Sequence, residues 1–410
     1  MGSALVENGT NNLSFLQNIG SNIVEWIGSF LLKSPSWGAL SISFPNGHIR
    51  TIGNAKSKNH AYLKLNNFKV ISQIKRRGTL GFAHSYINGD VESDDLTLLF
   101  KFFLMNRDIF NKAGLGLIKR AASDLAYHLS RANSRTMAKE NISEHYDLGN
   151  EFYSLWLDKT MTYSSAIFSS KGQSLEQAQI KKYHHIAKAV GVKKGNSVLE
   201  IGSGWGGFAQ VIAKDYQTKI RGISLSKQQL KFAKTRIRQQ GLDDLASFHF
   251  EDYRDSKGKY DHVCSIEMIE AVGEENWHKY FKAVHDRLKQ GGTAAIQAIT
   301  IAQSDFEDYK GNPDFIQRYI FPGGMLLTKD NMRQQGERAG LKLEGQELFG
   351  KSYAKTLRIW RENFIDKWSK IKELGFDEKF KRKWIYYLSY CEAGFLEGMI
   401  DVGIYQYRRI

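Results

Sequence analysis

The spacing of hydrophobic and polar positions changes along the chain and divides it into regions. Residues 13–33 place apolar side chains from Leu16 to Leu31 at intervals of three and four, with polar side chains such as Asn22 between them. This period predicts an amphipathic helix. A helix of this kind packs on its own domain or lies on a lipid bilayer, and both interpretations stay open.

Shorter, partly alternating segments follow and predict a small mixed α/β domain. ALSISF, HIRTIG and AYLKLNN are candidate strands, and Pro45-Asn46-Gly47 is a candidate turn. Ser93-Asp94-Asp95 is a plausible helix N-cap before the apolar run LTLLFKFFLM. We expect an N-terminal domain over residues 1–110 and a basic, partly helical connection over 111–144.

Strand and helix patterns alternate over the expected second domain, residues 145–410. The candidate strands are SVLEIG (197–202), KIRGIS (219–224), ASFHFED (246–252), DHVCSIE (261–267) and TAAIQAIT (293–300). The candidate helices cover roughly 174–190, 206–215, 226–240, 274–289 and 328–339. This alternation predicts an α/β fold, a Rossmann-like doubly wound parallel sheet covered on both faces. We expect the aromatic-rich tail, 355–410, to be helical.

Composition narrows the class of protein and its partners. The 410 residues carry a formal net charge of +15, which favours a polyanionic partner, either nucleic acid or an anionic membrane. No run of about 18 apolar residues predicts a transmembrane helix, and the N-terminus does not resemble a signal peptide. Cys264 and Cys391 are expected as buried free thiols of a cytoplasmic protein, and no Cys/His spacing suggests a metal site.

A glycine-rich turn after the first strand of the second domain carries the candidate chemistry. Gly202, Gly204 and Gly206 follow the strand that contains Glu200 and precede a helix, so the backbone can approach a ligand closely. Glu200 could hold the α-amino group of a methionine moiety. The next strand ends without the acidic residue that a nicotinamide cofactor requires; instead, Ser224, Leu225 and Gln229 could serve ribose hydroxyls.

Two further strand ends extend this candidate pocket. Asp252 and Tyr253 follow the third strand and suit the edge and face of an adenine ring. The fourth strand ends at Glu267-Met268-Ile269-Glu270. Ligands of doubly wound sheets bind outside the carboxyl ends of the strands, so these residues are expected at one sheet edge.

The chain resembles the cyclopropane fatty acid synthase family, which includes the mycolic acid cyclopropane synthases. The motifs that carry the resemblance are HYDLGNEFYSLWLD (145–158), MTYSSAIF (161–168), VLEIGSGWGG (198–207), GISLSKQQ (222–229), DYRD (252–255), EMIEAVGEENW (267–277), YIFPGGML (319–326) and YYLSYCEAGF (386–395). The resemblance implies a class I methyltransferase fold and S-adenosylmethionine as cofactor. It also implies transfer of a methyl carbon to the cis double bond of a phospholipid acyl chain.

The resemblance also implies roles for particular residues. Tyr163 and Ser164 are expected to contact the cofactor. The family holds a bicarbonate ion as base, and Glu270, the backbone amide of Ile299 and Tyr353 match three of its ligands. Ser165 stands where the family has Cys and Gln297 where it has His. Because glutamine does not titrate, it cannot offer a positive charge to a bound bicarbonate anion as histidine can. The methyl transfer is therefore better supported by the sequence than the ring closure that needs this base.

Several functions therefore stay open at this point. The first is formation of a cyclopropane ring, and the second is a methyl-branched or still unsaturated chain. N-methylation of a small amine and a non-enzymatic lipid- or nucleic-acid-binding role are alternatives. We expect an enzyme peripheral to the inner face of an anionic phospholipid membrane, with an unsaturated phospholipid as substrate and no nucleic acid partner. Whether it forms a homodimer is left open.

Overall fold

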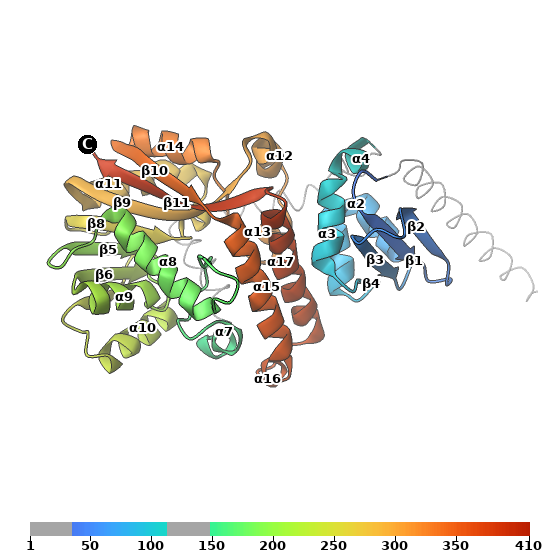
Figure 1. The fold of residues 1–410 in the computed structure, drawn as a ribbon, viewed down its shortest axis with the longest axis horizontal. Helices are drawn as coiled ribbons and strands as arrows, with labels where there is room; N and C mark the ends of the chain where they lie inside the picture. The colour runs from blue at the N-terminus through green and yellow to red at the C-terminus, as the bar shows by residue number, and fades with distance from the viewer. Residues whose placement is uncertain (1–34, 113–147) are drawn as a thin grey trace, which may run out of the picture. The chain divides into compact units, whose positions relative to one another are not determined.

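The computed structural model describes residues 35–112 and 148–410 (Figure 1). Clustering of backbone contacts divides the chain into two compact units, Met1–Ala121 and Ala122–Ile410. The expected amphipathic helix at 13–33 lies outside the described residues, as does the expected connection at 111–144 except for its first two residues. Each unit is described by itself.

The N-terminal unit is a four-stranded sheet with helices, as the alternating segments predict. Its strands lie in the order β2-β1-β3-β4, with β1 antiparallel to β2 and parallel to β3. The strands are β1 (Ala39–Ser43), β2 (Ile49–Gly53), β3 (His60–Leu65) and β4 (Val91–Glu92). The helices are α2 (Lys69–Ile87), α3 (Leu96–Met105) and α4 (Arg107–Lys112). The Asp95 carboxylate accepts a hydrogen bond from the Leu98 backbone amide (2.9 Å), which confirms the predicted N-cap of α3.

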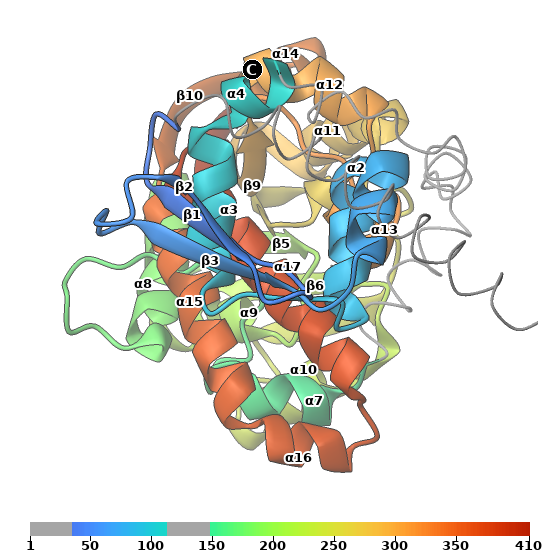
Figure 2. The ribbon, with the colours of Figure 1, turned by 90° about the vertical axis from the view of Figure 1, so that its right-hand side faces the viewer.

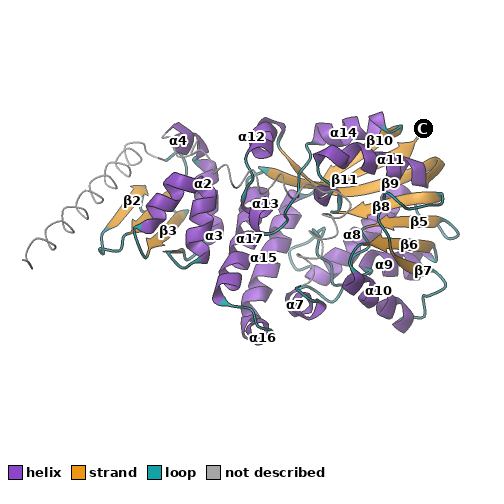
Figure 3. Cartoon of the chain, turned by 180° about the vertical axis from the view of Figure 1, so that it is seen from behind, coloured by secondary structure: helices purple, strands orange, loops and turns teal. Residues whose placement is uncertain are grey.

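The second unit contains a seven-stranded sheet in the order β10-β11-β9-β8-β5-β6-β7 (Figure 3). Five neighbouring strands, β9, β8, β5, β6 and β7, are parallel, and β11 and β10 add antiparallel strands at one edge. The strands are β5 (Ser197–Ile201), β6 (Lys219–Ser224), β7 (Ala246–Phe250), β8 (Tyr260–Ile266), β9 (Leu288–Ile301), β10 (Leu341–Leu348) and β11 (Ile400–Arg409).

Helices cover both faces of this sheet. Alternate strand residues explain the two layers: Val198 and Cys264 belong to a core shared with α8, α9 and α10, whereas Leu199 and Val263 belong to a core shared with α11 and α14. The helices are α7 (Asn150–Trp156), α8 (Leu175–Val190), α9 (Gly207–Tyr216), α10 (Lys227–Gln239), α11 (Trp277–Arg287), α12 (Phe306–Gly311), α13 (Phe315–Tyr319), α14 (Lys329–Arg338), α15 (Gly350–Asp366), α16 (Trp368–Glu373) and α17 (Glu378–Leu396). Short 3-10 helices cover Ile269–Ala271, Glu274–Asn276 and Gln303–Asp305. The predicted doubly wound α/β fold is confirmed.

The tail differs from the prediction in its last ten residues. Helices α15 and α17 pack side by side, as Figure 2 shows, and bury aromatic side chains such as Trp360 and Trp384. The helical prediction is wrong beyond Leu396, because Ile400–Arg409 forms β11 and pairs antiparallel with β9. Cys264 and Cys391 are free thiols, as expected, although only Cys264 is fully buried. No helix within residues 35–112 and 148–410 is long and apolar enough to cross a membrane.

Candidate active site

The turn between β5 and α9 has the open backbone that its glycines predict. Gly202, Gly204 and Gly206 all have positive φ, which L side chains rarely adopt. A Cβ at Gly204 would meet no atom within 4 Å, so this glycine faces open space. A Cβ at Gly202 would lie 2.9 Å from the side chain of Met268, and one at Gly206 would lie 2.9 Å from Ala233 and Phe248. Gly204 therefore borders a ligand space, whereas Gly206 is required for packing.

A pocket opens beside this turn, at the carboxyl ends of the parallel strands. It is lined by nine of the eleven predicted cofactor residues: Tyr163, Ser164, Glu200, Gly202, Gly204, Ser224, Leu225, Gln229 and Tyr253. Residues from the loop before α8 thus meet residues that follow β5, β6 and β7. One Glu200 carboxylate oxygen, Oε2, is buried without a hydrogen-bond partner among the described residues. Burial raises the pKa of Glu200 well above its usual value.

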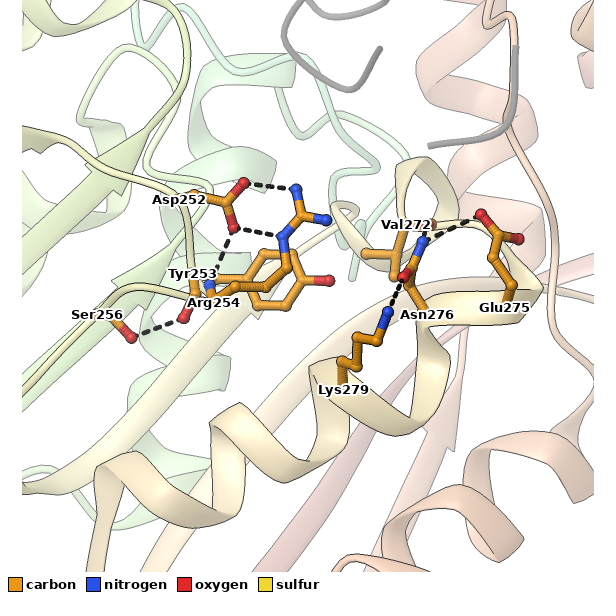
Figure 4. Close-up of polar contacts among 8 residues, drawn as sticks. All are labelled: Asp252, Tyr253, Arg254, Ser256, Val272, Glu275, Asn276 and Lys279. Carbon is orange, nitrogen blue, oxygen red and sulfur yellow. Dashed lines mark hydrogen bonds and ion pairs between the residues drawn. The ribbon is translucent and has the colours of Figure 1, made fainter. Parts of the chain in front are cut away.

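Gly206 and Asp252 do not line this pocket, contrary to expectation. Both carboxylate oxygens of Asp252 accept hydrogen bonds from the Arg254 guanidinium, at 2.8 and 2.6 Å (Figure 4). The neighbouring Glu251 lines the pocket instead and forms an ion pair with Arg221 on β6. The position of Asp252 after the third strand predicted a contact with adenine, but its carboxylate is paired with Arg254, two residues further along the same loop.

Three of the five predicted acceptor-site residues converge on a carboxylate that was not among them, that of Glu267. Its Oε1 accepts hydrogen bonds from the Ser165 backbone amide (2.8 Å) and the Gln297 side-chain amide (2.7 Å), and its Oε2 accepts one from the Tyr353 hydroxyl (2.6 Å). Ser165 acts through its backbone, since its hydroxyl bonds the Ala166 carbonyl. Burial raises the pKa of Glu267, while these donors oppose the shift.

The backbone of Glu267 adopts a left-handed conformation, which sets the direction of its side chain. Its φ is +48°, a left-handed conformation that costs a non-glycine residue roughly 1–2 kcal/mol. It follows the last residue of β8, and its amide donates to the Gln297 carbonyl of β9 (2.8 Å). Glu267 lines the cofactor pocket, so the strained turn presents its carboxylate to the ligand space.

Glu270 and Ile299 form a second contact beside this group. The Ile299 backbone amide donates to Glu270 Oε1 (2.6 Å). The sequence predicted these two residues for the same site, and the structure places them in contact. Glu270 Oε2 is buried without a partner within the part of the chain that the structure describes. Burial, with repulsion from the Glu267 carboxylate, raises the pKa of Glu270 to about 8.

Lys182 on α8 is a further site residue that sequence reasoning missed. It is fully buried and donates to the Ser164 hydroxyl (2.7 Å). Burial lowers its pKa to about 7, opposed by attraction to Glu267, Asp158 and Glu200. A lysine among apolar positions of a helix was the available signal, because a buried lysine needs a charged partner.

The two implied small molecules fit these residues differently. S-adenosylmethionine fits, because the unpartnered Glu200 oxygen suits an ammonium group and the space over Gly204 admits a ligand. Bicarbonate does not fit. The Ser165, Gln297 and Tyr353 donors already hold the Glu267 carboxylate, and a second anion there would be repelled. The expected bicarbonate site is corrected accordingly.

Comparisons with known proteins agree with this geometry. The family model described as mycolic acid cyclopropane synthetase matches residues 133–405. The chain is 37% identical over 338 residues to tuberculostearic acid methyltransferase UfaA1 of Mycobacterium tuberculosis, covering 80% of this chain and 79% of that protein. It is 32% identical to the cyclopropane-fatty-acyl-phospholipid synthase of Escherichia coli strain K12, covering 82% and 84%.

A solved structure adds a cofactor product to the comparison. The mycolic acid cyclopropane synthase CmaA1, complexed with SAH and CTAB, is 26% identical and superposes with a TM-score of 0.62. The match covers 66% of this chain and 98% of that chain.

Proposed function

Since this chain belongs to the mycolic acid cyclopropane synthetase family, we propose that it methylates the cis double bond of an unsaturated phospholipid acyl chain. It is an S-adenosylmethionine-dependent methyltransferase that modifies lipid acyl chains. The finer assignment names the phospholipid and the bond that is attacked. One observation carries it: a pocket that suits the cofactor ends at a carboxylate residue, Glu267, rather than at a nucleophile, and a second carboxylate, Glu270, is buried beside Glu267.

This arrangement suits attack by a double bond, which needs no activated nucleophile. The cofactor supplies a methyl group on a sulfonium, which is already electrophilic, so the protein has to align the acceptor and exclude water. Methylation of an alkene leaves a positive charge on the acyl chain. The Glu267 carboxylate and the ring faces of Tyr163 and Tyr353 are the groups that would stabilise this charge.

The first candidate product is a cyclopropane ring. A ring forms when the added methyl group loses a proton, and a carboxylate beside the cofactor pocket can take it. The Escherichia coli relative, named for cyclopropane synthesis, supports this candidate.

The second candidate is a methyl-branched or still unsaturated chain. The relative named as tuberculostearic acid methyltransferase, with 37% identity, favours it. The presence of Ser165 and Gln297 at the positions of the family's Cys and His favours it as well.

A labelled methyl group tests both the function and the product. The protein is incubated with vesicles of a cis-unsaturated phospholipid and S-adenosylmethionine carrying a trideuterated methyl, and the fatty acids are analysed by mass spectrometry. A ring retains two of the three deuterium atoms, because one leaves as the ring closes. A methyl group whose chain loses a proton elsewhere retains all three. Absence of label from the acyl chains contradicts the proposed function.

We further propose that the enzyme works as a peripheral protein on an anionic membrane at its cytoplasmic face. The net charge of +15 supports attraction to anionic lipid. The substrate supports it too, because a phospholipid acyl chain resides in a bilayer. The alternative acceptor, a small soluble amine, requires no such docking.

A further inference from the structure

Glu267 occupies the place of an anion at the acceptor end of the cofactor pocket. Three donors from three separate parts of the chain point at its carboxylate: the Ser165 amide, the Gln297 side chain on β9 and the Tyr353 hydroxyl on α15. Donors gathered from distant segments around one point form a preorganised anion site. In this chain the anion is covalently attached, through a residue held at a φ of +48°.

We propose that Glu267 replaces a bound bicarbonate ion and accepts the proton that the methylated acyl chain loses. This inference rests on the proposed function and adds the identity of the base to it. Because the base belongs to the chain, turnover requires no bicarbonate. The assignment holds for a cyclopropane ring and for a methylated chain that stays unsaturated, since both form when a proton leaves the cation.

The electron accounting is the same for both products up to the last bond. The π pair of the acceptor forms the carbon–carbon bond to the methyl carbon, while the carbon–sulfur bond breaks and leaves its pair on sulfur. The neighbouring chain carbon becomes a cation. A C–H bond of the methylated chain then breaks, its pair forms the ring bond or a new double bond, and the proton passes to Glu267.

Oxygen Oε2 of Glu267 is the better proton acceptor of the two. Among the described residues, Oε1 accepts two hydrogen bonds, from Ser165 and Gln297, whereas Oε2 accepts one, from Tyr353. A carboxylate oxygen has two lone-pair sites, so Oε2 keeps one for the proton. Because Glu267 lines the open pocket, the proton can pass to solvent when the product leaves.

The neighbouring carboxylate is less suited to this role. Glu270 is held by the Ile299 amide and does not line the pocket. Burial and repulsion from the Glu267 carboxylate raise the pKa of Glu270 to about 8, which disfavours its ionised form. Lys182, which donates to the Ser164 hydroxyl, favours the ionised form of Glu267 by charge attraction.

Two substitutions separate a base from a structural carboxylate. Glu267→Gln keeps the shape and removes the proton acceptor, and the loss in turnover is expected to be at least about a hundredfold. Glu267→Gly suits the backbone, because glycine adopts positive φ freely, and it empties the space that the donors surround. Added formate or bicarbonate should then raise the turnover of Glu267→Gly at least about tenfold, since the three donors that held the carboxylate are free to bind a small anion.

The assay uses the full chain, labelled S-adenosylmethionine and vesicles of a cis-unsaturated phospholipid, in buffer freed of carbon dioxide or supplemented with bicarbonate. Calorimetry with S-adenosylmethionine shows that each variant keeps its fold and pocket. Glu274→Gln is the matched control, since Glu274 is a half-buried glutamate seven residues further on that pairs with Lys310 and does not line the pocket, and this variant should keep wild-type turnover. Wild-type turnover is expected to be equal in both buffers.

Three outcomes overturn the assignment of Glu267 while leaving the methyl transfer intact. They are wild-type turnover that depends on bicarbonate, Glu267→Gln turnover within about threefold of wild type, and failure of both anions to restore Glu267→Gly. If the wild-type chain transfers no label to phospholipid in either buffer, the proposed function fails, and the assignment of Glu267 fails with it.

Discussion

A side chain introduced at Gly204 would extend into the space proposed for the cofactor, so substitution at this residue tests that assignment. Its Cβ direction is open, and Glu200 and Ser224 border the same pocket. We expect Gly204→Val to weaken S-adenosylmethionine binding by more than about tenfold, or about 1.4 kcal/mol, because the isopropyl group fills the ligand space. Calorimetric titration measures this loss.

A second glycine separates this effect from backbone strain. Gly241 also has positive φ (+64°) and open space around its Cβ, but it lies after α10, away from the pocket. Gly241→Val should lose stability comparably, since valine at positive φ costs roughly 1–2 kcal/mol, while keeping full affinity for the cofactor. Equal loss of affinity in the two variants would show that strain, not occupancy of the pocket, is responsible.

Glu270 gives a pH dependence of stability that can be isolated by substitution. Its folded-state pKa of about 8 lies above the unfolded value, so the folded state binds the proton more tightly. Its stabilising contribution is therefore complete below the unfolded pKa and is lost as pH rises through 8. We expect the free energy of unfolding of wild type, relative to Glu270→Gln, to fall steadily between pH 5 and pH 8 (about the two pKa values). Urea unfolding of both proteins across this range measures the difference, and a difference that rises with pH contradicts the assigned shift.

The sequence predicts most residues of the acceptor site, but it does not predict that the Glu267 carboxylate lies at its centre. Ser165, Gln297 and Tyr353 come from segments far apart in the chain, and the family resemblance was sufficient to bring them together. The position of Glu267 depends on a left-handed turn after β8 that only the packed sheet imposes, so its motif EMIE does not reveal which glutamate faces the pocket. Asp252 is the converse case, because its pairing with Arg254 depends on side-chain geometry that the motif DYRD leaves open.

At the scale of elements, local periodicity predicts the parallel strands and misses the antiparallel edge. The strands from β5 to β8 are runs of five to seven residues rich in apolar side chains, and their type follows from that pattern. β11 follows a long aromatic helix, and its four consecutive buried residues, Val402–Tyr405, show no alternation that separates a strand from a helix. Its structure is decided by pairing with β9 and β10, which are distant in sequence.

The N-cap of α3 offers a local test of an element that the sequence does specify. Asp95 accepts from the Leu98 amide, and replacing a capping aspartate with alanine costs about 1 kcal/mol of helix stability. We expect Asp95→Ala to speed amide hydrogen exchange in the first turn of α3 about fivefold, which corresponds to that free energy. Asp94→Ala makes the same charge change one residue earlier and should leave the exchange rates unaltered. Equal rates in the two variants would show that the cap does not stabilise the helix.

At the scale of the whole molecule, the chain combines a methyltransferase unit with an N-terminal unit that relatives partly share. The match to the Escherichia coli enzyme covers 82% of the chain and so extends beyond the family match, which begins at residue 133. On the proposed function the enzyme has to reach an acyl chain inside a bilayer, and the +15 charge supports the proposed attraction to anionic lipid. This attraction is screened over about 8 Å at physiological ionic strength.

Vesicle sedimentation should therefore resolve two components of membrane binding. We expect binding to anionic vesicles to weaken as salt rises, with a salt-insensitive remainder that comes from the apolar side of the helix that the sequence predicts over residues 13–33. Ile23→Glu should remove that remainder, because burying an isoleucine side chain contributes about 2 kcal/mol. Asn22→Glu changes the net charge equally on the polar side and should reduce only the salt-sensitive part. Equal binding of wild type to neutral and anionic vesicles at low salt contradicts the electrostatic component, and equal behaviour of the two variants contradicts the apolar one.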